Sequence, residues 1–144
     1  MKLPLTCVVA VLMAAASAQE PANLTYTGAQ AARGEVLYQQ RCAACHGEDV
    51  NGDGNGITPA LFGPAFAANW GGLPLSDLLQ RIQLEAGQSK PAGLTRAQQA
   101  DVLAFLLQVN EIVDGAAELP ADLGQLSRVR FSELTTLAAR RAPR

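Results

Sequence analysis

Two cysteines and a histidine stand close enough in the chain to act on a single ligand. The run Cys42-Ala43-Ala44-Cys45-His46 places two thiols three residues apart, with an imidazole directly after the second. Thiols at this spacing suit thioether bonds to one edge of a porphyrin, and the adjacent imidazole then reaches the iron as an axial ligand. A covalent tether would also keep this group bound in a domain too small to enclose it. We therefore expect one covalently bound haem c on Cys42, Cys45 and His46.

Three other uses of the same motif remain open. A zinc site normally has four ligands of the Cys and His types, and His46 is the only histidine of the chain. A redox-active dithiol of the thioredoxin type belongs at the start of a helix that follows a strand, whereas this motif follows a predicted helix. A disulfide between Cys42 and Cys45 would close a very short loop and stabilise the fold little.

The first residues have the composition of an export signal. Met1-Lys2 is followed by a mostly apolar run to Ala16, and small residues stand around Ala18, where a signal peptidase would cut. The run is shorter than the roughly 20 apolar residues of a membrane-spanning helix, although an uncleaved anchor is the alternative. We expect residues 1–18 to be a signal peptide and the mature protein to be periplasmic, without a membrane span. Cleavage would remove Cys7 and both methionines, Met1 and Met13.

Helical patterns occupy most of the remaining chain. Capping pairs at Thr27 with Gln30 and at Thr95 with Gln98 each precede apolar residues at helical spacing. Nowhere is there an alternation of apolar and polar residues strong enough for a sheet, so the chain is predicted to be all-α. The predicted helices run from about Gly28 to Arg41, from Leu75 to near Gly87, from Thr95 to Val109 and within Ser132–Arg141.

The stretch Gly47–Gly63 predicts a long loop directly after the cysteine motif. It is rich in Gly, Asn and Asp, and a loop of this length in a small domain usually wraps a ligand. It also opens like a calcium loop of the EF-hand type, with Asp49, Asn51 and Asp53 at alternate positions. Ala60 stands where the bidentate glutamate of such a loop belongs, which argues against calcium.

Together these motifs resemble a class I c-type cytochrome over about residues 29–122. In that family a glycine and an aromatic residue four positions later let the first helix cross closely against an aromatic residue of the last. Gly34, Tyr38 and Phe105 match these positions. The resemblance implies a small monohaem cytochrome c fold, with three to five helices wrapped around one haem and joined by long loops.

The resemblance also implies further haem contacts. Pro59 matches a proline whose carbonyl accepts the Nδ1 proton of the ligand histidine, and Leu61 matches a leucine that packs on the haem. Trp70 matches a tryptophan whose indole N–H reaches a haem propionate. The expected cofactor-binding residues are therefore Cys42, Cys45, His46, Pro59, Leu61 and Trp70, with His46 as the iron ligand.

One family feature is missing. Class I electron carriers place a methionine sulfur on the sixth iron position, and the corresponding residue here is Ala86. With no second histidine, the remaining possibilities are the Lys90 amine, a new N-terminal amine, water, a partner's side chain or nothing. Since methionine ligation raises the potential, its absence predicts a lower one.

Charge divides the chain. Residues 19–122 hold five basic and twelve acidic residues, whereas residues 123–144 hold five arginines and one glutamate. We expect a cytochrome domain over residues 19–125 and a basic C-terminal tail over residues 126–144 that contains the last short helix. An acidic exported body makes nucleic acid an improbable partner.

Three functions compete. The first is a periplasmic electron carrier or electron-transfer subunit, not an enzyme on its own. Its redox partner would be a periplasmic quinoprotein dehydrogenase or a terminal oxidase; the strings Leu73–Leu78 and Ala116–Asp122 resemble cytochrome domains that accompany such dehydrogenases. The second is a five-coordinate haem protein that binds or senses nitric oxide, carbon monoxide or peroxide. The third is an interaction subunit that docks through its basic tail.

Overall fold

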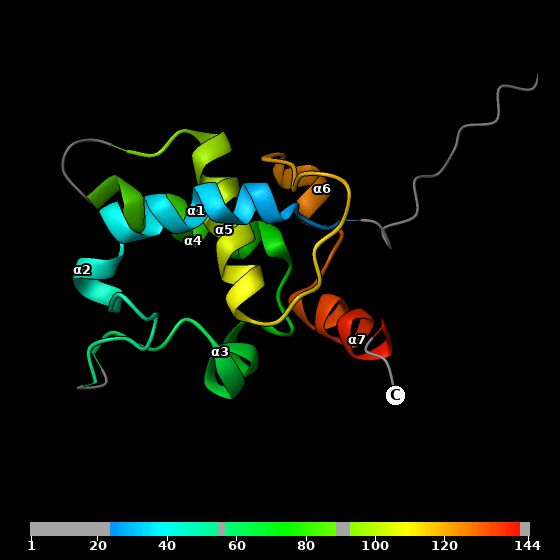
Figure 1. The fold of residues 1–144 in the computed structure, drawn as a ribbon, viewed down its shortest axis with the longest axis horizontal. Coiled ribbons are helices and arrows are strands. Elements are labelled where there is room, and N and C mark those ends of the chain that lie inside the picture. Colours follow the sequence, from blue (N-terminus) through cyan, green and yellow to red (C-terminus); the bar gives the residue numbers. More distant parts are fainter. Residues whose placement is uncertain (1–23, 55–56, 89–92, 142–144) are drawn as a thin grey trace, which may run out of the picture.

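The fold is all-α, as expected. The computed structural model describes residues 24–54, 57–88 and 93–141. The expected signal peptide, both methionines and Lys90 lie outside these ranges. None of the helices within them has the length and apolar character needed to cross a membrane. The helices are α1 (Gly28–Arg41), α2 (Ala43–His46), α3 (Gly63–Trp70), α4 (Leu75–Gln88), α5 (Arg96–Val109), α6 (Leu123–Leu126) and α7 (Phe131–Arg141) (Figure 1).

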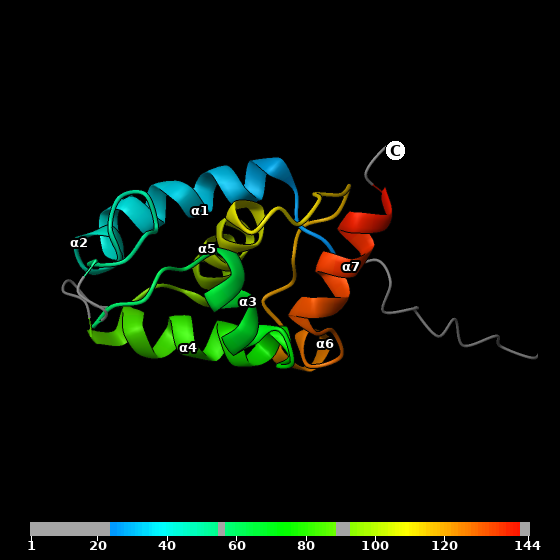
Figure 2. The ribbon, with the colours of Figure 1, turned by 90° about the horizontal axis from the view of Figure 1, so that it is seen from below.

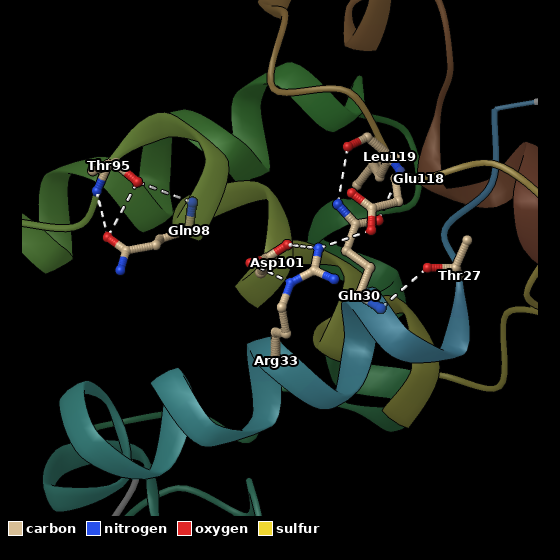
Figure 3. Close-up of polar contacts among 8 residues, drawn as sticks. All are labelled: Thr27, Gln30, Arg33, Thr95, Gln98, Asp101, Glu118 and Leu119. Atoms are coloured by element: carbon tan, nitrogen blue, oxygen red, sulfur yellow. Dashed lines mark hydrogen bonds and ion pairs between the residues drawn. The ribbon is translucent and has the colours of Figure 1, made fainter.

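Helix α5 is the centre of the molecule. Its first turn is closed by a full capping box, in which Thr95 and Gln98 each bind the other's backbone N–H (Figure 3). Every residue from Gln99 to Leu107 is buried, as expected of a helix covered on all sides. Figure 2 shows α1 and α4 on opposite sides of α5, with α2 near one end of the molecule and α6 and α7 near the other.

Helix α1 has the predicted bounds, but its capping pair works differently from the prediction. The Thr27 hydroxyl accepts a hydrogen bond from the backbone N–H of Gln30 at 3.1 Å. The Gln30 side chain does not return this bond. It is buried and bonds both backbone groups of Leu119, at 3.0 and 2.7 Å (Figure 3). This glutamine therefore ties α1 to the segment after α5.

The predicted crossing of the first and last family helices is confirmed for α1 and α5. A Cβ atom at Gly34 would overlap the backbone carbonyl of Asp101 and would lie 3.0 Å from the Cβ of Phe105. One turn later the rings of Tyr38 and Phe105 pack with their centroids 5.2 Å apart. Only glycine lets the two helix backbones approach this closely.

An ion-pair network reinforces the same crossing. Arg33 of α1 binds the Asp101 carboxylate with two nitrogens, at 3.1 and 2.9 Å. One of these two nitrogens, Nη2, also lies 2.9 Å from an oxygen of Glu118 (Figure 3). Because the Asp101 side chain is almost buried, this bidentate contact fixes the rotation of α1 about α5.

Helix α3 was not predicted, and the structure shows why a helix forms there. Pro64 lies in the first helical turn, where its missing N–H costs nothing. Phe66 then packs edge-on against Phe131 at 5.6 Å between ring centroids. The described residues form seven helices rather than three to five. Two of the seven, α2 and α6, are single turns.

The boundary at residue 125 does not separate two parts of the structure. The segment set apart as a basic tail contributes buried residues to the common core: Leu126, Val129, Phe131 and Leu134. The Val129 carbonyl accepts a hydrogen bond from the backbone N–H of Leu75 at the start of α4. The predicted final helix is present as α7. The arginines there alternate with core residues, which a count of charges does not reveal.

Candidate functional site

The cysteine motif forms a single helical turn at the end of α1. The backbone N–H groups of Cys45 and His46 both bond the Cys42 carbonyl, at 3.1 and 2.9 Å. The next residue, Gly47, bonds the Ala43 carbonyl at 2.8 Å and ends the turn with a φ of 79°. On a helix, positions i, i+3 and i+4 share one face. The two thiols and the imidazole therefore project from the same side of α2.

Tyr38 connects this turn to the crossing of α1 and α5. Its ring is buried against Phe105, and its hydroxyl donates a 2.6 Å hydrogen bond to the carbonyl of Gly47. The sequence indicated the packing role of the ring but not the bond from its hydroxyl. That bond fixes the backbone immediately after His46.

Cys42 and Cys45 are both free thiols, Cys45 exposed and Cys42 half-buried. Burial, and then the nearby Glu85 and Cys45, raises the pKa of the Cys42 thiol to about 11. A redox-active dithiol needs the opposite, because a lowered pKa provides the reactive thiolate. The environment of Cys42 therefore does not favour a thioredoxin-like pair.

His46 faces helix α4. Its side chain is 15% exposed, and its Nε2 atom lies 3.3 Å from Oε2 of Glu85. The Nδ1 atom is buried and has no hydrogen-bond partner among the described residues. The bond expected between Nδ1 and the Pro59 carbonyl is therefore not formed here. The ring turns its Nε2 edge toward Glu85, and Pro59 itself is exposed.

Glu85 is the residue at this site that sequence reasoning missed. One carboxylate oxygen contacts His46, and the other accepts a 2.6 Å hydrogen bond from Arg81 one turn earlier. Both contacts, that of His46 first, lower the pKa of the Glu85 carboxyl. The one signal in the sequence was its place directly before Ala86, the position at which the family has its methionine.

The loop after the turn folds back on itself. The backbone N–H of Gly52 bonds the His46 carbonyl at 2.8 Å. Gly52 has a φ of 78°, and a Cβ atom there would overlap the Thr58 carbonyl oxygen and lie 2.9 Å from the carbonyl carbon of Pro59. A glycine is therefore required for the segment containing Pro59 to lie against the segment that follows His46.

Leu61 is held by both of its backbone groups. Its N–H bonds the Val50 carbonyl at 2.9 Å, and its carbonyl accepts a 2.9 Å bond from the Asn110 side chain. The Leu61 side chain is half-buried against the core. Asn110 ends α5 and also accepts a bond from the N–H of Gly63, so it joins the loop to the central helix.

Trp70 lies at the end of α3, farther along the chain from the turn. The indole is half-buried, packs against the core and lies 6.2 Å from the Phe66 ring. The residues predicted to contact haem thus come from α2, from the loop before α3 and from the end of α3.

Comparison with known proteins decides the family. A family model described as cytochrome c matches residues 31–110, more than half of the chain. This chain belongs to the cytochrome c family. No curated protein and no solved structure shows significant similarity to it. Cytochromes c bind haem c covalently, usually one in a domain of this size, and use it in electron transfer.

The residues of this cytochrome fit haem c. Two free thiols and an imidazole share one face of a helical turn, which is the donor set that two thioethers and one axial ligand require. The buried Nδ1 of His46 has no partner in the described part of the chain, whereas a metal-binding histidine donates from the nitrogen opposite the metal. That nitrogen is available for such a bond.

A bare metal ion fits less well. Within the described ranges no three His, Cys, Asp or Glu side chains converge on a point that could hold one. In the loop that opens like a calcium site, the Asp49 carboxylate accepts hydrogen bonds from the backbone and side chain of Asn51. Neither zinc nor calcium is supported at these positions.

Proposed function

We propose that this cytochrome is a periplasmic electron-transfer protein or subunit in which Cys42 and Cys45 hold one haem c and His46 binds its iron. The observation that carries the proposal is the helical turn from Cys42 to His46, which places two free thiols and the imidazole at positions i, i+3 and i+4. When bound, haem c supplies an iron that alternates between the ferric and ferrous states.

The surrounding residues keep this donor set rigid. Tyr38 and Gly52 donate hydrogen bonds to the carbonyls of Gly47 and His46, so the backbone at and directly after the ligand is fixed. A rigid ligand suits electron transfer, because little must move when the charge of the iron changes. In the same proposal, Leu61 packs on the haem, Trp70 donates to a propionate, and the Pro59 carbonyl accepts the Nδ1 proton once haem is attached.

Haem attachment is tested with cysteine variants. The native protein should retain the mass of haem after denaturation, and the Cys42→Ala/Cys45→Ala double variant should lose it. Each single variant should keep haem through one thioether. Ala44→Ser, an exposed change between the two cysteines, is the matched control and should behave as native. A native protein without covalent haem, or a double variant that keeps it, would refute the assignment.

Export and partner are part of the same proposal. The composition of residues 1–18 supports cleavage by a signal peptidase, so N-terminal sequencing of the protein from a periplasmic fraction should begin at Gln19. The partner is a periplasmic quinoprotein dehydrogenase or a terminal oxidase. Stopped-flow mixing of the reduced protein with such an oxidase, and of the oxidised protein with such a dehydrogenase, shows which exchange is fast.

A second candidate function is the binding of a small ligand such as carbon monoxide, nitric oxide or peroxide. One observation favours it: at the methionine position, Ala86 is a buried residue of α4 whose methyl group cannot bind iron. Fast binding of carbon monoxide together with slow electron exchange with both classes of partner would favour this function over the carrier.

A further inference from the structure

We propose that Glu85 is the distal residue of this cytochrome, with its carboxylate binding the iron on the side opposite His46. The inference rests on the proposed attachment of haem at Cys42, Cys45 and His46. It concerns the position at which the family's methionine is missing.

The structure places the Glu85 carboxylate beside the ligand nitrogen. Its Oε2 atom lies 3.3 Å from Nε2 of His46. The other ring nitrogen, Nδ1, is buried and has no partner among the described residues. Both views place α2 and the C-terminal end of α4 at the same end of the molecule (Figures 1 and 2). The bonds of a metal such as zinc to imidazole and carboxylate are about 2.0–2.2 Å each, so an ion in line between them sets the two atoms about 4 Å apart. The carboxylate needs to withdraw by only about 1 Å, which side-chain rotation in a glutamate provides.

Other donors are few. His46 is the only histidine, and Met1 and Met13 are the only methionines, both at the far N-terminal end of the chain. The Lys90 amine, named above as a candidate, must lose its proton before it can bind iron. Ala86 has no donor atom. Since no three possible ligand side chains converge on a bare ion in the described part of the chain, the pairing of His46 with Glu85 suits an iron that brings its other four ligands in a porphyrin.

Arg81 prepares the carboxylate for this role. It binds Oε1 of Glu85 at 2.6 Å and leaves Oε2 directed at His46. The contact with an always-charged guanidinium keeps the carboxylate anionic and oriented. The Glu85 side chain is 38% exposed, so it has room to move when the iron is present.

An anionic oxygen donor gives the iron a different character from a methionine sulfur. Hard oxygen ligands favour the more highly charged ferric iron, whereas a soft neutral thioether favours the ferrous state. The Glu85 carboxylate therefore lowers the potential. As a weak-field ligand it also leaves the ferric iron high-spin, and an exogenous ligand can displace it.

The test uses two variants at Glu85 and the same two changes at Glu35, an exposed glutamate of α1. Glu85→Gln should raise the midpoint potential by at least 59 mV, a tenfold shift of a one-electron equilibrium. Glu85→His should convert the ferric iron to a low-spin form with two imidazole ligands, seen by electron paramagnetic resonance. It should also slow the binding of carbon monoxide to the ferrous protein at least tenfold. Glu35→Gln and Glu35→His should change none of these.

The outcomes separate this proposal from the proposed function. If the native protein carries covalent haem but the Glu85 variants match the Glu35 variants in potential and spin state, Glu85 does not face the iron and only this inference fails. If the native protein carries no covalent haem, the proposed function fails and the role of Glu85 fails with it. A change to low spin in Glu85→His but not in Glu35→His supports both the proposed function and the role of Glu85.

Discussion

Replacing Gly34 with alanine should destabilise the protein even though alanine is the better helix former. The added methyl group would overlap the Asp101 carbonyl and press on Phe105, and neither backbone can turn aside as a side chain would. Overpacking of this kind costs about 1–3 kcal/mol, and contact between two backbones belongs at the upper end. Alanine regains about 1 kcal/mol of helix propensity. The net loss is about 2 kcal/mol, or about 6–10 °C in Tm for a domain of this size.

The assay is denaturant unfolding of the haem-bearing protein, followed by far-ultraviolet circular dichroism. Gly87→Ala is the matched control, because Gly87 lies near the end of α4 and a Cβ atom there meets nothing within 4 Å. The control should be unchanged or more stable by up to about 1 kcal/mol. A Gly34→Ala protein as stable as its parent would show that α1 and α5 cross less closely than the structure has them.

Three further predictions concern buried polar side chains. Gln30→Ala leaves both backbone groups of Leu119 without a partner and should cost about 2 kcal/mol in urea unfolding; a loss below about 0.5 kcal/mol would contradict this. Tyr38→Phe removes the bond to Gly47 and should cost about 1 kcal/mol. It should also alter the ferric spectrum, whereas Tyr26→Phe should not. Burial raises the pKa of Tyr26 from 10.0 to about 12. Between pH 10 and 12 the Tyr26 hydroxyl ionises in the unfolded chain but not in the folded one. The free energy of unfolding should therefore fall over this interval, and Tyr26→Phe should reduce the fall.

The elements that the sequence predicts well are those whose signals are local. Helices α1 and α5 begin where Thr27 and Thr95 stand before apolar residues at helical spacing, and both caps form. The close crossing was also predicted, but from the family resemblance of Gly34, Tyr38 and Phe105, and the structure places these residues where α1 meets α5. For the two helix starts, a few neighbouring residues contain the whole signal.

The missed elements depend on partners far away in the chain. The sequence predicted a loop up to Gly63 and no helix directly after it, yet α3 forms there, and its Phe66 has an aromatic partner in Phe131, 65 residues later. The C-terminal segment appeared to be a basic tail because its arginines dominate a count of charges. Its apolar residues, Val129 among them, are seen to be core residues only once their contact with the start of α4 is known.

The site divides in the same way. Cys42, Cys45 and His46 lie within one helical turn, so their spacing alone predicts that they share a face. Glu85 reaches them from a helix 39 residues away, and no short motif marks it. The expected bond to Pro59 also spans a loop, and a family pattern cannot fix the rotation of an imidazole.

The two sides of the proposed iron site differ in the same respect, since His46 is held by local contacts and Glu85 by its place on a distant helix. On the His46 side the ligand stands on a closed helical turn, and hydrogen bonds from Tyr38 and Gly52 fix the backbone around it. On the opposite side, Glu85 is a half-exposed side chain on the surface of α4, steadied by Arg81. Changes on the first side should therefore lower stability, since they disturb the crossing of α1 and α5. Changes at Glu85 should alter the potential and the ligand affinity while the fold stays intact, so the two properties can be varied independently.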